Sequence, residues 1–471
     1  MNERPEYLRL VCLTPVHIGT GVEYAGGVDY ITQKNITYLL DSERVLEKLY
    51  AAGQLRDAGD LKSKVESLFK HERLDDYALA QCSGAVPGVL KIRAAIRAGD
   101  GRPIIPGSSL KGALRTLIYA GRLSTNGPHS DLRPERRAEL ENAVAQASQH
   151  PTKAAESLEA DVFRSSVLPE FHDLSGAQRD LMRMCSLSDA LFSPSATRIA
   201  ITGIAGASGK IRMPVEALAA NSNAVLQLQL SARYYESMFK DKDLPLSWDT
   251  VSEWSRRHAL HLLKTERQYF ADLSGDSPRD YGKIIERLRD LREQIERADQ
   301  RTTFLRLGWG SGWRTMTGDV LDDQQRLRLP PKSGQKGPKT RKVIVADGSQ
   351  NAVDVLGWIS LTPIPETEAL HMLRDIPPPR LKPPPIDALA AESAFPGTDS
   401  LLKRIEALQA TKWGEVADLY RRAAENESLK NTRLAALGRK ISQMWKNDKR
   451  RLREAAEKFP ELTPHLTARS G

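Results

Sequence analysis

His17 is the side chain in this sequence whose setting best suits acid–base chemistry. It lies in a glycine-punctuated segment, residues 14–21 (TPVHIGTG), and is followed by Gly19 and Gly21. A histidine in such a loop could act as a general base. It could equally contact a phosphate or be a hydrogen-bonded structural residue. The sequence shows no catalytic partner for it, so these three interpretations stay open.

A second segment, residues 104–116 (IIPGSSLKGALRT), could bind a phosphate. We expect Ser108 and Ser109 to cap a helix, whose first N–H groups and dipole attract anions. Lys111 and Arg115 are four residues apart and therefore share a face of that helix. The alternative is a capped surface helix with a solvated basic face.

The third segment, residues 304–318 (FLRLGWGSGWRTMTG), alternates glycines with tryptophans. Such a loop exposes backbone N–H donors that can follow a phosphate backbone. Trp309 and Trp313 could stack on bases or pack in the core, and packing is the slightly favoured interpretation. The spacing does not match a dinucleotide-binding fingerprint. The candidate contacts in this segment are Arg306, Gly308, Trp309, Gly310, Ser311, Gly312 and Arg314.

Signatures of common enzymes are missing from the sequence. Residues 203–210 (GIAGASGK) have the wrong spacing for a phosphate loop, and no Gly-x-Ser-x-Gly elbow occurs. His258 and His261 lack the glutamate of a zinc protease. The three cysteines suit neither a disulfide framework nor a cysteine-built metal site. We therefore predict no catalytic residue, no metal site and no cofactor.

Positive charge is concentrated in two internal islands and one terminal region. The 471 residues carry a formal charge of +9. Residues 90–122 contribute +6, residues 301–342 contribute +7 and residues 401–471 contribute +7, so the remainder is slightly acidic. Such patches are the footprint of a polyanion partner, most often a nucleic acid, although solvated faces are the alternative for each.

Hydrophobic periodicity and turn signals predict an α+β fold. Strands are expected at 8–13, 36–40, 89–98, 186–192, 198–204, 224–230 and 353–361, and helices at 43–52, 250–263 and 278–297. The order β-α-β-β-α at the start is compatible with a ferredoxin-like (RRM-like) unit. The predicted domains are an RRM-like half at 1–123, a helical insertion at 124–184, a second RRM-like half with the glycine-rich loop at 185–365, a Pro-rich tether at 366–400 and a basic helical tail at 401–471.

Composition places the chain among ordinary globular proteins. Hydrophobic residues make up 40% and charged residues 27%. No apolar run approaches the length of a membrane span, and no secretory leader is recognisable. We therefore expect a cytoplasmic protein without a membrane partner.

The three segments together resemble the RAMP superfamily of CRISPR proteins. Residues 14–21, 105–116 and 307–313, followed by 356–359 (LGWI), carry this resemblance. It spans roughly residues 7–365, and Asp29-Tyr30 and Ser188-Asp189 also fit the pattern. The order and spacing are most similar to the family formed by the fifth subunit of the type III-A Csm complex.

This resemblance implies two RRM-like domains and a non-catalytic subunit that binds crRNA. Such a subunit caps the backbone filament at the crRNA 3′ end, next to the neighbouring backbone RAMP subunits, and supports crRNA maturation and antiviral defence. The serines and basic residues of 104–116 and the glycines and Arg314 of the third segment then become RNA contacts. On this basis, replacing Lys111 and Arg115 with alanine should weaken RNA binding without unfolding the protein.

Two alternatives remain. One is a metal-independent endoribonuclease that processes precursor crRNA with His17 as its base. The other is a RAMP subunit of a type III-B complex. The resemblance also leaves open whether host nucleases are recruited for 3′ trimming.

Overall fold

The computed structural model divides the chain into two compact units, unit 1 (Met1–Leu381) and unit 2 (Lys382–Gly471). The residues that the structure describes are 6–55, 60–86, 88, 90–123, 134–147, 156–164, 167–206, 212–231, 237–238, 247–276, 281–312, 314–315, 321, 325, 328, 341–346, 351–376, 401, 405, 408, 413–424, 430–445 and 448–466.

One sheet of unit 1 is antiparallel throughout and has the strand order β13–β16–β1–β12–β8. Its strands are β1 (Glu6–Cys12), β8 (Cys185–Leu187), β12 (Asn223–Leu230), β13 (Thr303–Arg306) and β16 (Trp358–Ile364). Leu8 and Leu10 of β1 are fully buried and alternate with exposed Arg9, as a strand with one core face requires. The first strand of the sequence is thus the centre of this sheet.

The other large sheet of unit 1 has the order β2–β6–β11–β10–β5–β4–β3, and β14 joins it through β10 and β15. Its strands are β2 (Gly19–Tyr24), β3 (Tyr30–Gln33), β4 (Ile36–Leu40), β5 (Ala78–Ser83), β6 (Ile92–Ala95), β10 (Thr197–Ile204), β11 (Met213–Leu218), β14 (Lys342–Val345) and β15 (Ala352–Asp354). β6 pairs with β11 and β5 with β10 in parallel, whereas the other pairs are antiparallel. A short ribbon joins β7 (Ile104–Ile105) to β9 (Ala190–Leu191).

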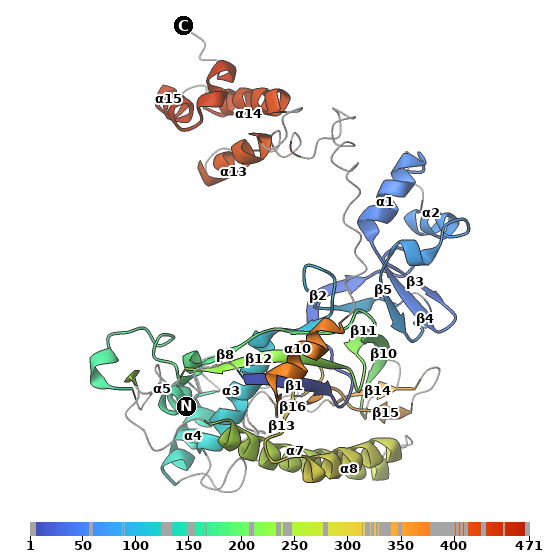
Figure 1. Cartoon of the computed structure of the whole chain (residues 1–471), viewed down its shortest axis with the longest axis vertical. Helices are drawn as coiled ribbons and strands as arrows, with labels where there is room; N and C mark the ends of the chain where they lie inside the picture. Colours follow the sequence, from blue (N-terminus) through green and yellow to red (C-terminus); the bar gives the residue numbers. More distant parts are fainter. Residues whose placement is uncertain are drawn as a thin grey trace. The chain divides into compact units, whose positions relative to one another are not determined.

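Long helices bury the core faces of these sheets. Helix α3 (Gly107–Leu123) packs Leu110, Leu114 and Leu117 into one core with Leu8 and Leu10. Helices α7 (Trp248–Asp276) and α8 (Gly282–Arg297) lie side by side and enclose a second core (Figure 1). Helix α10 (Glu366–Arg374) packs on β1 and β12. The result is a mixed fold in which helices and sheets share two apolar cores.

Smaller helical segments complete unit 1. Helices α1 (Ser42–Ala51) and α2 (Leu61–Leu68) form a satellite lobe beyond β4 and β5 with its own small core (Figure 1). Helices α4 (Pro134–Gln146) and α5 (Glu156–Arg164) join the core of α3. The short 3-10 turns are η1 (Leu74–Asp76), η2 (Pro169–Phe171) and η3 (Leu181–Met184).

Unit 2 is a helical body with a hydrophobic core of its own. It contains α13 (Trp413–Ala424), α14 (Lys430–Met444), α15 (Lys449–Lys458) and η4 (Pro460–His465). Trp413 packs against Trp445 and Phe459, with ring centroids 4.9 and 6.4 Å apart. The basic region that the sequence predicts as helical is therefore folded around aromatic residues.

Several predicted elements are confirmed, while others needed correction. The strand at 36–40 is β4, and the helix expected at 43–52 is α1, which Asp41 caps. The single strand expected at 353–361 is wrong, because β15 and β16 are separate strands. The sheets do not divide at residues 123 or 185, since each contains strands from both expected halves. Of the Pro-rich tether predicted at 366–400, residues 366–374 form helix α10, and residues 377–400 lie outside the described residues.

Candidate nucleic-acid interface

The glycine-rich loop is joined to the segment that follows β1. The backbone N–H of Trp309 donates to the carbonyl of His17 at 2.8 Å, and Gly357 donates to Pro15 at 2.9 Å. Gly308 has φ +82° and approaches so closely that a Cβ there would lie 2.6 Å from the His17 oxygen. Backbone hydrogen bonds thus join residues 14–21, 304–318 and 356–359 (LGWI) into one loop cluster.

Trp309 sits at the centre of this cluster. Its partly buried indole packs on a small apolar group from β10, β11, β14 and the turn before β16. Lys342 Nζ lies 3.9 Å and the Arg93 guanidinium carbon 5.0 Å from the ring centroid. The His17 ring meets the indole edge to face at 5.9 Å. The tryptophan therefore packs against the protein and also holds two cations. The apolar group is Ala200, Val215, Ala217, Ile344 and Leu356.

His17 is a buried, hydrogen-bonded residue. Its side chain is 2% exposed, and Nδ1–H donates to the carbonyl of Glu216 at 2.6 Å. Because a carbonyl only accepts, Nε2 is left as the unprotonated nitrogen, and it faces Gly19. Burial lowers the pKa of His17, and the charge of Arg93 lowers it further. A neutral, enclosed imidazole suits a structural role better than that of a base reaching an RNA hydroxyl.

Glu216 holds the strands beneath His17 together. Its side chain is fully buried, accepts from the backbone N–H of Ala95 at 3.0 Å, and pairs with Arg97. Arg97 is itself only 12% exposed. This buried pair links β11 to β6, the strand that carries Arg93.

The basic helix α3 uses its polar groups inside the protein. It begins at Gly107, one residue before the serines expected to cap it, and Gly107 N–H donates to the Asp189 carboxylate at 2.8 Å. That carboxylate occupies the anion position which the sequence suggested for a phosphate. Ser108 is exposed in the first turn and Ser109 is partly buried.

Lys111 and Arg115 both have intramolecular partners. Lys111 Nζ donates to the carbonyl of Cys185 at 2.7 Å. Arg115 donates to both carboxylate oxygens of Asp180 at 2.8 Å, and its guanidinium lies 3.8 Å from the ring centre of Phe163. These contacts tie α3 to the segments around it, so we leave both residues out of the interface.

The expectation that Arg306 contacts phosphate is corrected by its burial. Its side chain is 4% exposed and pairs with Glu266 at 3.2 Å, while Nε donates to the carbonyl of Leu356 at 3.0 Å. Arg341 pairs with the same carboxylate at 2.7 Å. Glu266 of α7 thereby ties the end of β13 and the residue before β14 to α7.

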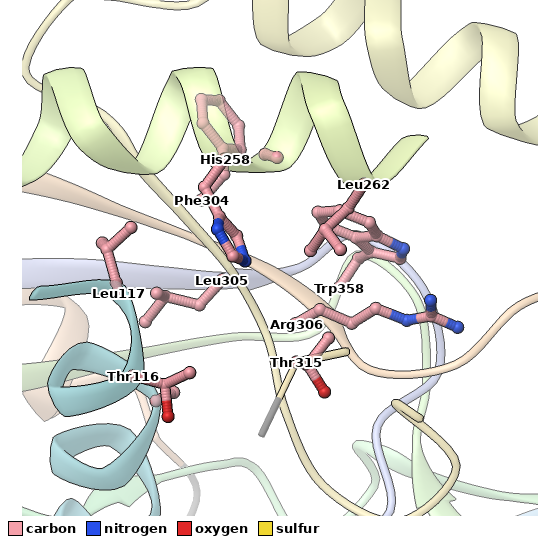
Figure 2. Close-up of a pocket in the computed structure, with 11 residues that line it drawn as sticks. Thr116, Leu117, His258, Leu262, Phe304, Leu305, Arg306, Thr315 and Trp358 are labelled. Atoms are coloured by element: carbon pink, nitrogen blue, oxygen red, sulfur yellow. The ribbon is translucent and has the colours of Figure 1, made fainter. Parts of the chain in front are cut away.

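A small cavity separates α3 from the end of the glycine-rich loop. Figure 2 shows Thr116 of α3, His258 of α7, Leu305 of β13 and Thr315 around it. Its volume of about 20 Å³ is enough for one water molecule and far too small for a nucleotide. Burial lowers the pKa of His258 to about 3, so this histidine is neutral.

The remaining candidate residues differ in exposure. Gly21 lies in the exposed strand β2, and Gly312 is partly exposed with open space beside it. Ser311 is buried, and its hydroxyl donates to the carbonyl of Gly308 at 2.9 Å. Gly310 and Arg314 are partly buried, and Trp313 lies outside the described residues.

Arg93 and Lys342 are candidate residues that the motifs did not reveal. Arg93 belongs to the basic island 90–122, and Lys342 and Trp309 belong to the island 301–342. The two islands therefore meet at one indole ring. The excess of positive charge in the two islands was the signal available in the sequence. Only the fold shows which of their cations lie at the Trp309 ring.

The described residues offer neither a metal site nor a membrane-spanning helix. In the part of the chain that the structure covers, no group of three or more His, Cys, Asp or Glu side chains could hold a metal ion. No helix among the described residues is long and apolar enough to cross a membrane.

A mixed α and β framework that presents cations, an aromatic ring and a glycine-rich loop together is typical of proteins that bind polyanions. The family model of the RAMP superfamily matches residues 9–315, and the chain belongs to this superfamily. No curated protein matches the chain.

Two solved structures show the same fold. One is a chain of a Csm–crRNA–target RNA ternary complex from a type III-A CRISPR-Cas system, with 22% identity and a TM-score of 0.52 over 76% of this chain and 100% of that chain. The other is Csm5 of T. onnurineus, with 22% identity and a TM-score of 0.53 over 74% of this chain and 99% of that chain.

Proposed function

We propose that this RAMP protein is a crRNA-binding subunit of a type III-A Csm interference complex. It would cap the backbone filament at the crRNA 3′ end and support crRNA maturation. The observation that carries this proposal is the meeting of both basic islands at Trp309, within the glycine-rich loop. The likeness to subunits of Csm complexes supports it.

The topology of the antiparallel sheet supports one RRM-like unit. The order β16–β1–β12–β8, with α3 between β1 and β8 and with α7 and α8 between β12 and β16, follows the β-α-β-β-α-β scheme of ferredoxin-like folds. In this arrangement β13 is an added edge strand. The other large sheet would then supply the surface that carries Arg93 and Lys342.

The proposed subunit binds RNA without cleaving it. An endoribonuclease would need a base near a bound 2′-hydroxyl, and His17, the candidate, is buried with Nε2 facing Gly19. A type III-B subunit would differ in its neighbours, and co-purification with backbone subunits distinguishes the two systems. The same experiment reveals any host nuclease recruited for trimming. The proposal implies a cytoplasmic protein whose partners are crRNA and the adjoining RAMP subunits.

The test is a retardation assay of the full chain with 3′-labelled crRNA, with and without EDTA. We expect binding that weakens steeply with salt, and no product. A product that survives EDTA and disappears in His17→Gln would make the protein a processing enzyme. Absence of binding, both alone and with the backbone subunits, would overturn the proposal.

A further inference from the structure

The ring of Trp309 is occupied by protein groups where a base would have to stack. The indole rests on the apolar group of the second sheet, His17 meets it edge to face, and Arg93 and Lys342 lie over it. A stacking base would have to displace a cation that the ring attracts. The indole is therefore better suited to hold these cations than to bind a base.

Arg93 and Lys342 differ from three other cations of the basic islands. Arg97, Arg115 and Arg306 each pair closely with a carboxylate that is largely buried. Among the described residues, the one ion pair of Arg93 is a long contact with Glu23, 3.9 Å between atoms, and Lys91 shares that carboxylate at 3.8 Å. Lys342 makes no ion pair among the described residues. The charge at this indole is therefore poorly compensated, which favours an anionic ligand.

The two cations are fixed before any ligand arrives. Arg93 lies on β6 and Lys342 at the start of β14, so strands of one sheet hold them on a common ring. Burial and the nearby Arg93 charge lower the pKa of Lys342. An anion between the two side chains would relieve this repulsion, and no side chain would need to be reordered for binding.

We propose that Arg93 and Lys342 form a subsite for a backbone phosphate of RNA and that Trp309 is the residue that positions both cations. This inference rests on the proposed function and adds the chemical group of the RNA that the protein recognises, a backbone phosphate. Recognition at this point is then independent of base identity. That suits a subunit that must accept crRNAs of any sequence.

The test compares two probes of equal length, a single-stranded oligouridylate and the same ribose-phosphate chain with abasic residues. Binding is measured between about 50 and 200 mM salt. The variants are Trp309→Ala, Trp309→Phe and the double change Arg93→Gln with Lys342→Met. A matched control, Arg289→Ala with Arg297→Ala, removes two exposed cations of α8 that are 58% and 81% exposed.

For a phosphate subsite, the cation variant should lose about tenfold in affinity at about 150 mM salt. Its salt slope should fall by about 1.4, two contacts at roughly 0.7 each. Trp309→Ala should lose affinity equally on both probes, Trp309→Phe should retain part of it, and combining Trp309→Ala with the cation variant should add little. The α8 control should leave the slope unchanged.

Two results separate failure of this inference from failure of the proposed function. If the wild-type chain binds and Trp309→Ala weakens only the base-containing probe, Trp309 stacks on a base and the inference is wrong. An unchanged slope in the cation variant also overturns it. If the wild-type chain binds neither these probes nor crRNA, the proposed function itself fails.

Discussion

Replacing Gly308 with alanine should destabilise unit 1 more than the same replacement at Gly312. Both glycines have positive φ, +82° and +92°, so an alanine at either position pays the same backbone strain of about 1–2 kcal/mol. They differ in their surroundings. A Cβ at Gly308 would lie 2.6 Å from the carbonyl oxygen of His17, whereas nothing lies within 4 Å of a Cβ at Gly312.

The size of this difference in stability depends on which atom the new Cβ would contact. The His17 oxygen belongs to the backbone and accepts the Trp309 N–H at 2.8 Å, so it cannot rotate away without weakening that bond. A lost hydrogen bond costs about 1 kcal/mol, and displacement of the packed loop adds to it. We expect about 3 kcal/mol for Gly308→Ala and about 1.5 kcal/mol for Gly312→Ala.

Calorimetry of the full chain measures this difference. At roughly 2.1 cal/mol/K per residue, the 381 residues of unit 1 unfold with an entropy of about 0.8 kcal/mol/K. The melting temperature of unit 1 should therefore fall by about 4 °C for Gly308→Ala and about 2 °C for Gly312→Ala. The transition of unit 2 serves as an internal reference. Equal shifts at the two glycines would refute the argument that His17 restricts Gly308.

Other parts of unit 1 give three more predictions. Glu216→Ala leaves Arg97 without its buried carboxylate and should cost about 3 kcal/mol, seen as a lower melting temperature of unit 1. Arg115→Ala removes the ion pair with Asp180 and should destabilise unit 1 while the salt slope of RNA binding stays at the wild-type value; a smaller slope would return Arg115 to the interface. Burial lowers the pKa of His258 to about 3, so the neutral histidine contributes fully to the stability of unit 1 above about pH 6.5, and this contribution is lost as the pH falls towards 3. The free energy of unfolding should be lower by about 2 kcal/mol at about pH 5. His258→Gln should lack this part of the pH dependence.

Local signals in the sequence predicted single elements well. The strand predicted at 36–40 and the helices predicted at 43–52 and 278–297 correspond to β4, α1 and α8. Strand β11 was missed because Pro214 and Glu216 are poor strand residues in an isolated sequence. Glu216 is tolerated in the strand because Arg97, more than a hundred residues earlier, neutralises it.

The arrangement of the strands was less predictable. Period-2 patterns indicate that a segment is a strand, but they do not name its neighbour. The pairing of β1 with β12 and β16 joins residues hundreds of positions apart. Local patterns in the sequence do not report such pairings, so they could not show that one sheet combines strands from both predicted halves.

The candidate site was predicted by segment and only partly by residue. The sequence analysis singles out both the loop at His17 and the loop at Trp309, which the structure joins by a backbone hydrogen bond. Side-chain roles depended on remote partners. Arg115 pairs with Asp180, and Arg306 pairs with Glu266. Arg93 and Lys342 become candidates because both lie at the Trp309 indole. Charge alone therefore could not separate internal ion pairs from exposed cations.

The central position of β1 has a consequence for synthesis of the protein. Leu8 pairs with Leu226 on one side and with Pro363 on the other, so β1 acquires its second neighbour some 350 residues after it is made. At about 5–20 residues per second, the wait is roughly 20 to 70 s. During that time the edge of β1 that later pairs with β16 has unpaired backbone N–H and C=O groups and is open to association with other nascent chains or with chaperones. Unit 1 thus closes around its first strand only after residue 364 has left the ribosome.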